Sequence, residues 1–311
     1  MSDWLLFLLA SLIWGTTWLT IKFQLGVVAP PVSIVYRFGA AALLLFAWCA
    51  VRRVSLRLDR RTHASLVLVG ALQYSLNYVL IYASEEHLTS GLVAVVFSTV
   101  VLWNIIGSRI FLGAPTPPAV AVGASLGMVG VALVFAPELS GIATARDATL
   151  GVALAIAASI AAAAGNLVSQ RIYARGVSVL TSTPWAMLYG STLVAAYCTA
   201  RGLPFSFDPS PAYVLSLAYL ALFGSVFAFV SYLTLLQRIG ATRASYTAVA
   251  TPVLAMLTST FFENYRWTPL AVLGMVLVLG GNVMVLRGKQ AAARNEGSAP
   301  AARGVEKSAR A

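Results

Sequence analysis

The chain has 311 residues, of which 59% are hydrophobic and 10% are charged, whereas soluble globular domains carry roughly 25% charged residues. A water-soluble protein is excluded, because too little polar surface is available to cover such a particle. The net charge of +11 indicates nucleic-acid binding only where the basic residues form one face. Here they lie in short hydrophilic gaps and in the C-terminal tail, so we expect no nucleic-acid partner.

The first apolar run and the two cysteines narrow the class of protein further. The run begins at Trp4, behind Ser2 and Asp3, without the basic n-region and the cleavage site of a secretory signal, so we predict a retained membrane span. Cys49 and Cys198 lie inside apolar runs, away from other Cys or His residues. We interpret them as packing residues, which excludes a disulfide framework or a zinc cluster; we expect no metal and no cofactor.

Apolar runs long enough to cross a membrane recur along the whole chain. A bilayer core about 30 Å thick requires about 20 mainly apolar residues per helix, and lipid satisfies no backbone polar groups, so such runs must be helical. The sequence therefore predicts an all-α integral membrane protein with ten transmembrane helices. The predicted spans are 4–23, 32–51, 65–84, 90–112, 118–136, 150–170, 182–200, 212–235, 242–262 and 269–286.

The basic residues separate by loop, which predicts the orientation of the chain. Placing the N-terminus in the cytoplasm puts 16 of the 21 Lys and Arg residues inside, as the positive-inside rule requires. Both termini are then cytoplasmic. The tail 289–311 is rich in Ala, Arg, Gly and Ser without apolar periodicity, so we expect it to be disordered.

The second half of the chain repeats the first at a shift of about 150 residues. Segment 98–102 in span four matches 250–254 in span nine, and the glycines of span five match those of span ten at identical spacing. These glycines are Gly123 and Gly130, then Gly274 and Gly281. Two units follow, 1–141 and 142–288. Because each contains five spans, an odd number, the second unit is inverted in the membrane, an arrangement typical of secondary transporters.

Several motifs together resemble one family of transporters. They are Trp14-Gly15, Lys22, Pro30-Pro31 with Arg37, Thr251-Pro252-Val253, Glu263 and the paired glycines. On these residues the segment 4–286 resembles the EamA-type members of the drug/metabolite transporter superfamily. The resemblance implies a five-plus-five arrangement of spans and export of amino acids or related metabolites across an inner membrane.

The first unit departs from the family pattern at two positions. Val100 stands where a proline like Pro252 is common, and we expect this change to straighten span four. Gly113-Ala114 stands where a glutamate like Glu263 is expected, which removes a charge from a helix end. Both changes make it unsafe to transfer a specific substrate.

The polar residues of spans five and ten are few, whereas these spans hold much of the membrane glycine. Small residues let helix backbones approach closely. We therefore assign these two spans to peripheral packing or to a homodimer contact, and we expect the other eight spans to form the substrate cavity.

Span three carries the clearest polar face. Gln73 and Asn77 are four residues apart, and Tyr74, Tyr78 and Tyr82 form an adjoining stripe at helical spacing. We predict that Asn77, Tyr78 and Tyr82 contact the substrate. The alternative is an interior packing seam, with Tyr82 in an interfacial aromatic belt.

Further cavity candidates come from amides and aromatic residues of other spans. The alternative for the amides is hydrogen bonding between helices, worth roughly 0.6 kcal/mol on average in a membrane protein. The candidates are Trp14, Thr17, Trp103, Asn104, Asn166, Gln170, Tyr189, Tyr232 and Tyr246.

Charged residues within the spans point to function, because they are costly in lipid. Arg37 lies inside span two and either binds an anionic substrate group or ties two helices together. Lys22 lies at the end of span one, where we expect it to snorkel toward the interface. Glu85, Glu86 and Glu263 lie at span ends, and no carboxylate lies at mid-span. We therefore expect facilitated diffusion without a strict need for a proton gradient, or coupling by another route.

These observations favour a secondary transporter of small metabolites, an exporter of substrates such as amino acids. Efflux of drugs or other amphipathic compounds is the alternative within transport. An embedded enzyme would need a cluster of catalytic groups at membrane depth, which the sequence lacks. A sensory membrane protein has no evident use for the repeat.

Overall fold

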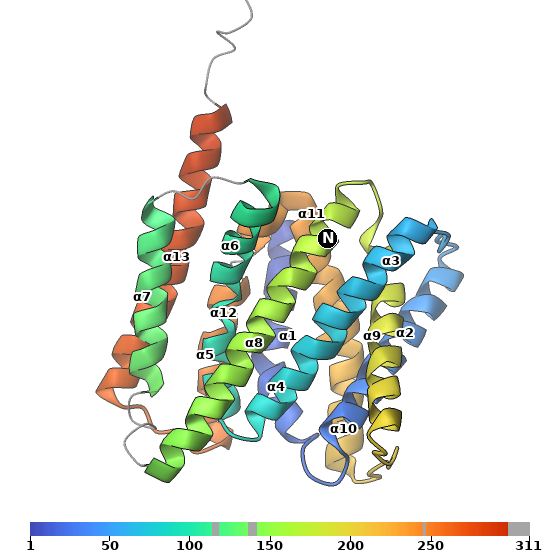
Figure 1. The fold of residues 1–311 in the computed structure, drawn as a ribbon, viewed down its shortest axis with the longest axis horizontal. Helices are drawn as coiled ribbons and strands as arrows, with labels where there is room; N and C mark the ends of the chain where they lie inside the picture. The colour runs from blue at the N-terminus through green and yellow to red at the C-terminus, as the bar shows by residue number, and fades with distance from the viewer. Residues whose placement is uncertain (114–117, 136–141, 245–246, 298–311) are drawn as a thin grey trace, which may run out of the picture.

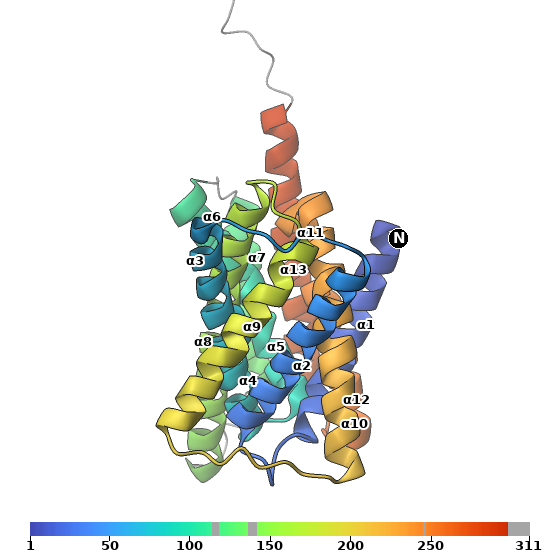
Figure 2. The same cartoon turned by 90° about the vertical axis from the view of Figure 1, so that its right-hand side faces the viewer.

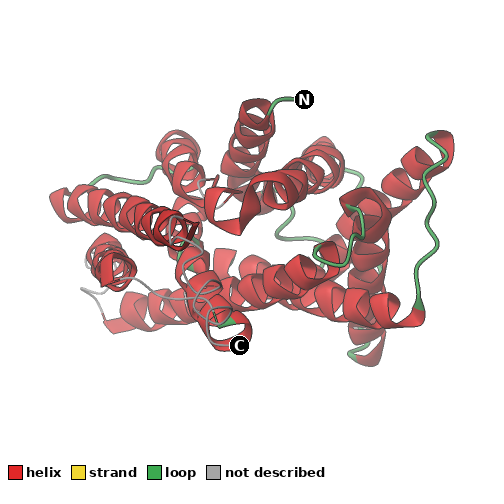
Figure 3. Cartoon of the chain, turned by 90° about the horizontal axis from the view of Figure 1, so that it is seen from above, coloured by secondary structure: helices red, strands yellow, loops and turns green. Residues whose placement is uncertain are grey.

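The computed structural model describes residues 1–113, 118–135, 142–244 and 247–297 of the chain. Within these residues every regular element is a helix and none is a strand (Figures 1 and 3). The first half contains α1 (Asp3–Lys22), α2 (Pro30–Val51), α3 (Arg60–Val69), η1 (Gly70–Leu76), α4 (Asn77–Glu85), α5 (Ser90–Phe97), α6 (Val100–Leu112) and α7 (Pro118–Phe135).

The second half continues the same alternation of helices and short connections. It contains α8 (Ile142–Tyr173), α9 (Val179–Ala200), α10 (Pro211–Tyr219), η3 (Leu220–Phe227), α11 (Ala228–Ala244), α12 (Thr247–Phe262) and α13 (Pro269–Gly297). Helix starts carry the expected signals: the side chains of Ser2, Asp59, Ser178 and Ser210 accept hydrogen bonds from first-turn amides, which satisfies groups that a helix leaves unpaired.

The helices have the length and surface of membrane spans. Six stretches are long and apolar enough to cross a membrane: Asp3–Lys22, Pro30–Val51, Arg60–Glu85, Ser90–Phe111, Arg146–Tyr173 and Pro211–Arg238. Shorter apolar helices add to these. Large apolar side chains such as Trp4, Leu43 and Val276 are well exposed, which suits lipid rather than water. The all-α membrane fold is confirmed, and the count of ten spans remains a prediction.

Several predicted boundaries differ from the structure, among them the start of span six, placed at 150 where α8 begins at Ile142. Span nine was placed from residue 242, but α11 continues to Ala244 and α12 begins at Thr247. The tail predicted to be disordered from residue 289 is helical to Gly297, because residues 289–294 include three alanines with Lys, Gln and Arg, all strong helix formers. The remaining tail residues, 298–311, lie outside the described residues.

Span four is broken, although the absence of a proline at Val100 predicts a straighter helix. α5 ends at Phe97 and α6 begins at Val100. Between them the amides of Ser98 and Thr99 bond to carbonyls three residues back, and the Ser98 hydroxyl donates to the Val95 carbonyl at 2.7 Å. Serine and threonine hydroxyls compete for helix carbonyls, which accounts for the interruption; the straightening expected from Val100 remains a prediction.

Spans three and eight each contain a wider, π-helical segment at mid-length. These are η1 (Gly70–Leu76) and η3 (Leu220–Phe227). π-helical turns are rare and concentrate at functional sites. The two segments begin 150 residues apart, which is the shift of the sequence repeat.

Helices of each half pack on helices of the other half, and the contacts are reciprocal. α1 packs on α12 and α11, while α8 packs correspondingly on α6 and α4; α2 packs on η3, while α9 packs on η1. Three further pairs join equivalent spans of the two halves: α2 with α9, α5 with α12, and α7 with α13. α1 begins and α13 ends at the same end of the bundle (Figures 1 and 2). We call the opposite end, where α1 and α4 finish, the Lys22 end.

α7 and α13 form a close pair at the edge of the bundle (Figure 1). A Cβ placed on Gly130 would lie 2.6 Å from the Gly274 carbonyl oxygen, and one placed on Gly274 would lie 2.5 Å from the Gly130 carbonyl oxygen. The glycines predicted to serve peripheral packing or a homodimer therefore bring spans five and ten together within one chain, and this face is not free for a second copy.

Replacing Gly274 by Ala should destabilise the protein, because the added methyl group meets backbone atoms of α7. Overpacking of this kind costs about 1–3 kcal/mol. Gly280→Ala on the same helix is the matched control, since nothing lies within 4 Å of its Cβ position. Melting temperatures in detergent should fall for the first variant and not for the second; equal values would contradict this account of the contact.

Candidate functional site

A cavity of about 800 Å³, including the part open to solvent, lies between the two halves. Its wall is built by α1, α2, η1, α4, α5 and α6 from the first half and by α8, α11 and α12 from the second. α7 and α13 contribute no residue to it. Largely apolar cavities with a few polar groups are typical of small-molecule binding.

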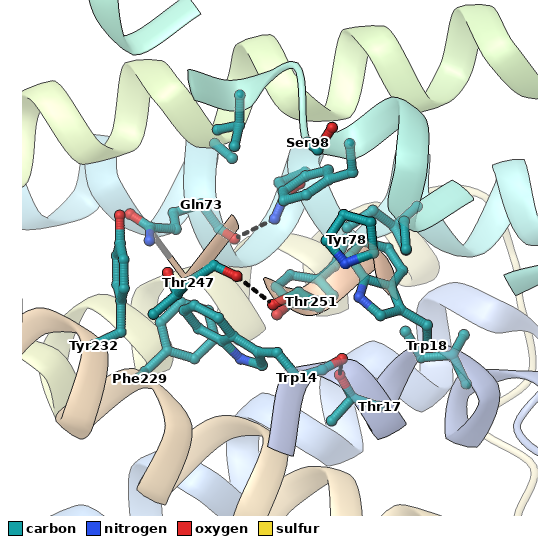
Figure 4. A pocket seen from close by; sticks show the side chains of 18 of the residues that line it. Trp14, Thr17, Trp18, Gln73, Tyr78, Ser98, Phe229, Tyr232, Thr247 and Thr251 are labelled. Carbon is teal, nitrogen blue, oxygen red and sulfur yellow. Dashed lines mark hydrogen bonds between the residues drawn. The ribbon is translucent and has the colours of Figure 1, made fainter. Parts of the chain in front are cut away.

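Aromatic side chains make up much of the cavity wall. Trp14 packs against Phe229 and Tyr232, with ring centroids 5.2 and 5.0 Å apart. Trp18 packs against Phe97 at 5.3 Å. In Figure 4, Trp14 and Phe229 lie on the side of the cavity opposite Gln73 and Ser98. This wall suits an apolar or aromatic substrate group.

Amide groups line the cavity near the first π-helical segment. The Gln73 amide donates to the Asn166 side-chain oxygen at 3.3 Å, which joins η1 to α8, and the Asn77 amide donates to the Gln73 carbonyl at 3.3 Å. The side-chain oxygens of Gln73 and Asn77 have no hydrogen-bond partner among the described residues. Two buried acceptors are therefore available to a ligand with N–H or O–H groups.

Arg37 brings a buried positive charge to the same wall. Its side chain is 1% exposed, its Nε donates to the Ser225 hydroxyl at 3.0 Å, and its guanidinium carbon lies 4.6 Å from the centre of the Tyr78 ring. The Nη1 group has no partner among the described residues. Among the described residues no Asp or Glu lines the cavity, so none balances the charge there, and an unpaired buried cation favours an anionic ligand.

The second π-helical segment is held by two cavity residues. The Trp14 indole N–H donates to the Gly224 carbonyl at 3.3 Å, and Arg37 bonds to Ser225. A Cβ placed on Gly224 would lie 2.8 Å from the Thr17 methyl group. The side chains that face the cavity thus fix the irregular backbone behind it.

The structure brings some of the predicted site residues together and separates others. Those that line the cavity are Trp14, Thr17, Arg37, Asn77, Tyr78, Asn166 and Tyr232. Those that lie elsewhere are Tyr82, Trp103, Asn104, Gln170 and Tyr189. Tyr82 is fully buried, and the Tyr189 hydroxyl bonds to His63 at 2.8 Å. Tyr246 lies outside the described residues.

The sequence analysis missed other cavity residues. Trp18, Ser98, Phe229, Thr247 and Thr251 line the wall, and Gln73 does so although it was noted only as part of the polar face. Trp18 follows Trp14 at helical spacing, which is a signal that was available. Thr247 and Thr251 are also four apart, but their hydroxyls bond to carbonyls of their own helix, a common role that gives no hint of a cavity.

Lys22 does not snorkel as the sequence suggested. Its Nζ donates to the carbonyl oxygens of Glu85 and Leu88 and lies 3.9 Å from the Glu263 carboxylate. The side chain turns into the protein because unpaired loop carbonyls are available there. Lys22 thus joins α1 to the ends of α4 and α12 at the Lys22 end.

The model of the EamA-like transporter family matches the chain twice, over residues 2–136 and 149–287. The chain belongs to this family. Membership of the EamA family places the protein in membrane transport and argues against an enzyme. Each half matches the family model separately, in line with the internal repeat.

Named relatives and a solved structure resemble most of the chain. An uncharacterized inner membrane transporter of Escherichia coli K12, YedA, is 29% identical over 280 residues, 89% of this chain and 88% of the relative. A probable amino-acid metabolite efflux pump of the same strain is 24% identical over 305 residues, 93% and 97% of the two chains. One crystal structure of a protein has the same fold, with a TM-score of 0.70 at 20% identity over 93% of this chain and 98% of the other.

Asn77→Ala should lower transport about two- to tenfold, because a hydrogen bond is worth about 0.5–1.5 kcal/mol and Asn77 lines the cavity. Asn104→Ala is the matched control: Asn104 is also buried with an unpartnered side-chain oxygen, but it lies outside the cavity wall. Both variants should show similar melting temperatures in detergent. Equal loss of transport in both would assign Asn77 to helix packing.

Proposed function

We propose that this EamA-family protein is a secondary transporter that exports small carboxylate-bearing metabolites such as amino acids across the inner membrane. The observation that carries the proposal is the cavity between the halves, with the unpaired Nη1 of Arg37 in an aromatic wall. Arg37 binds the carboxylate, and the free oxygens of Gln73 and Asn77 accept from the amino group. The name of the efflux-pump relative supports this substrate class.

The two units, 1–141 and 142–288, form inverted repeats of five spans each, and transport proceeds by alternating access. Two observations support this arrangement: helices of the two halves pack on one another reciprocally, and the family model matches each half. In inverted-repeat transporters the substrate site lies between the repeats, near the bilayer midplane. The cavity lined by helices of both halves supports this arrangement.

The chain crosses the membrane ten times with both termini in the cytoplasm. The Lys22 end then faces outward. Arg57→Cys and Phe205→Cys place thiols on exposed loop residues at opposite ends of the bundle, while the native Cys49 and Cys198 are buried. In intact cells a membrane-impermeant thiol reagent should label the variant at 205 and reach the variant at 57 only after permeabilisation. The reverse pattern would invert the orientation.

Efflux of amphipathic drugs is a second candidate, favoured by the mainly apolar wall. Arg37 separates the two candidates, because a drug cavity has no need of a carboxylate partner.

For uptake of L-leucine into proteoliposomes, Arg37→Gln should raise KM about 10- to 100-fold, since a hydrogen bond to a charged group contributes about 1.5–3 kcal/mol. Wild type should prefer L-leucine over L-leucinamide, which lacks the carboxylate, and the variant should lose this preference. Arg37→Lys, which keeps the charge without the planar fork, should lie between them.

Melting temperatures of the same purified variants control for folding. A folded Arg37→Gln protein with unchanged KM would assign Arg37 to structure. Equal transport of both compounds by wild type would favour drug efflux.

A further inference from the structure

Three charged groups, Lys22, Glu85 and Glu263, gather between the cavity and the Lys22 end of the bundle, next to Arg37 on the cavity wall. Ile21 and Ile81, one residue before Lys22 and one turn before Glu85, belong to the cavity wall. The cluster therefore lies directly beyond the cavity on this side, where α1, α4, α5 and α12 meet. Separating these helices would give the cavity an opening at the Lys22 end.

Glu263 has both hydrogen-bond donors and a positive charge close to its carboxylate. Its two carboxylate oxygens each accept from the Ser90 amide at 3.1 Å, and one also accepts from the Ser90 hydroxyl. Ser90 begins α5, and the amide end of a helix stabilises negative charge. Lys22 lies 3.9 Å away. The negative charge of Glu263 is thus compensated by Ser90 and Lys22.

Glu85 is buried without such compensation. It is 0% exposed, and neither carboxyl oxygen has a hydrogen-bond partner among the described residues. Lys22 donates to the backbone carbonyl of Glu85 instead of to its carboxylate. An ionised carboxylate buried without hydrogen bonds is very costly, whereas the neutral acid is much less so. The geometry fits a carboxyl group that carries a proton.

The charged and titratable groups around Glu85 come from each neighbouring helix. Lys22 lies on α1, Arg37 on α2, Tyr82 on α4 itself, and Glu263 follows α12. Asp147 on α8 is bound to His87 at 2.8 Å and is exposed. The positive charges of Lys22 and Arg37 are opposed by Glu263 and, when ionised, by Glu85.

We propose that Glu85 is a proton-binding site that locks the Lys22 end closed. With the proton bound, the neutral carboxyl stays buried and Lys22 remains on the carbonyls of Glu85 and Leu88. Opening separates these segments and admits water. The Glu85 carboxyl then gives its proton to water at the Lys22 end, and the resulting carboxylate pairs with the freed Lys22 ammonium. Closing requires that one proton return from the same solution.

The proton site can be tested without any substrate. Wild-type protein in liposomes at neutral pH should show the infrared C=O stretch of a neutral carboxylic acid. Glu85→Gln should lack this band, Glu85→Asp should shift it, and Glu86→Gln, at the neighbouring exposed residue, should retain it. Absence of the band in wild type, or its persistence unchanged in Glu85→Gln, would overturn the proposal.

The gating consequence rests on the proposed transport function and is tested separately, with L-leucine counterflow in proteoliposomes of known orientation. Wild-type transport should rise as pH rises at the Lys22 end, by up to about tenfold per pH unit for a single proton, and should not respond to pH at the other end. Glu85→Gln, which mimics the protonated acid, should transport slowly at all pH values, with a melting temperature no lower than that of wild type.

Each outcome of the counterflow experiment decides one of the two proposals. The same pH response in Glu85→Gln, or a response confined to the opposite face, would overturn the gate. Wild type that carries none of the compounds tested would count against the proposed substrate class, while the infrared band still decides the proton site. Glu86→Gln should keep the wild-type pH response.

Discussion

The structure depends on one constraint: lipid offers no hydrogen bonds to the chain. Every backbone group within the membrane must find its partner inside the protein, which is why the described elements are all helices. The same constraint makes exceptions informative, because an unpaired polar atom within the membrane cannot form a hydrogen bond to water instead. The Nη1 of Arg37 and the carboxyl of Glu85 are such exceptions; Arg37 lines the cavity, and Glu85 lies one turn beyond Ile81 of the cavity wall.

The closest backbone contacts of the bundle include the pair α7 and α13, which lies away from the cavity. α7 and α13 meet through glycines whose backbones nearly touch, and they leave the cavity to the remaining helices. The helices that line the cavity meet through aromatic rings and amides as well as through close glycine contacts.

The apolar helices could be predicted from sequence because hydropathy reports directly on the cost of burial in lipid. The breaks within spans could not. In span three, the regular i, i+4 stripe of Tyr74, Tyr78 and Tyr82 assumed one helical period, but η1 interrupts that period. Only Tyr78 of the three lines the cavity. Tyr74 lies within η1, and Tyr82 lies one turn beyond Tyr78 on α4, where it is fully buried. The hydroxyl-driven break at Ser98 and Thr99 was equally invisible to hydropathy.

Site residues could be predicted where a polar side chain would be costly in lipid. They could not be predicted where the site depends on contacts between helices of different halves. Asn77 and Arg37 stood out because both are costly in lipid. Thr247 and Thr251 looked like ordinary helix hydroxyls, and Glu85 looked like a residue at a span end. Its complete burial depends on Lys22 and on the end of α12, distant in sequence, and no local pattern encodes that neighbourhood.

The two π-helical segments also bear on the ancestry of the chain. Apolar helices resemble one another by composition, so matched leucines or alanines are weak signs of common descent. An irregular turn is different, since it interrupts the helix and has no general reason to recur. η1 and η3 begin at Gly70 and Leu220, in the third helix of each half. An ancestral five-helix unit that already contained this turn before its gene was duplicated accounts for both with one event.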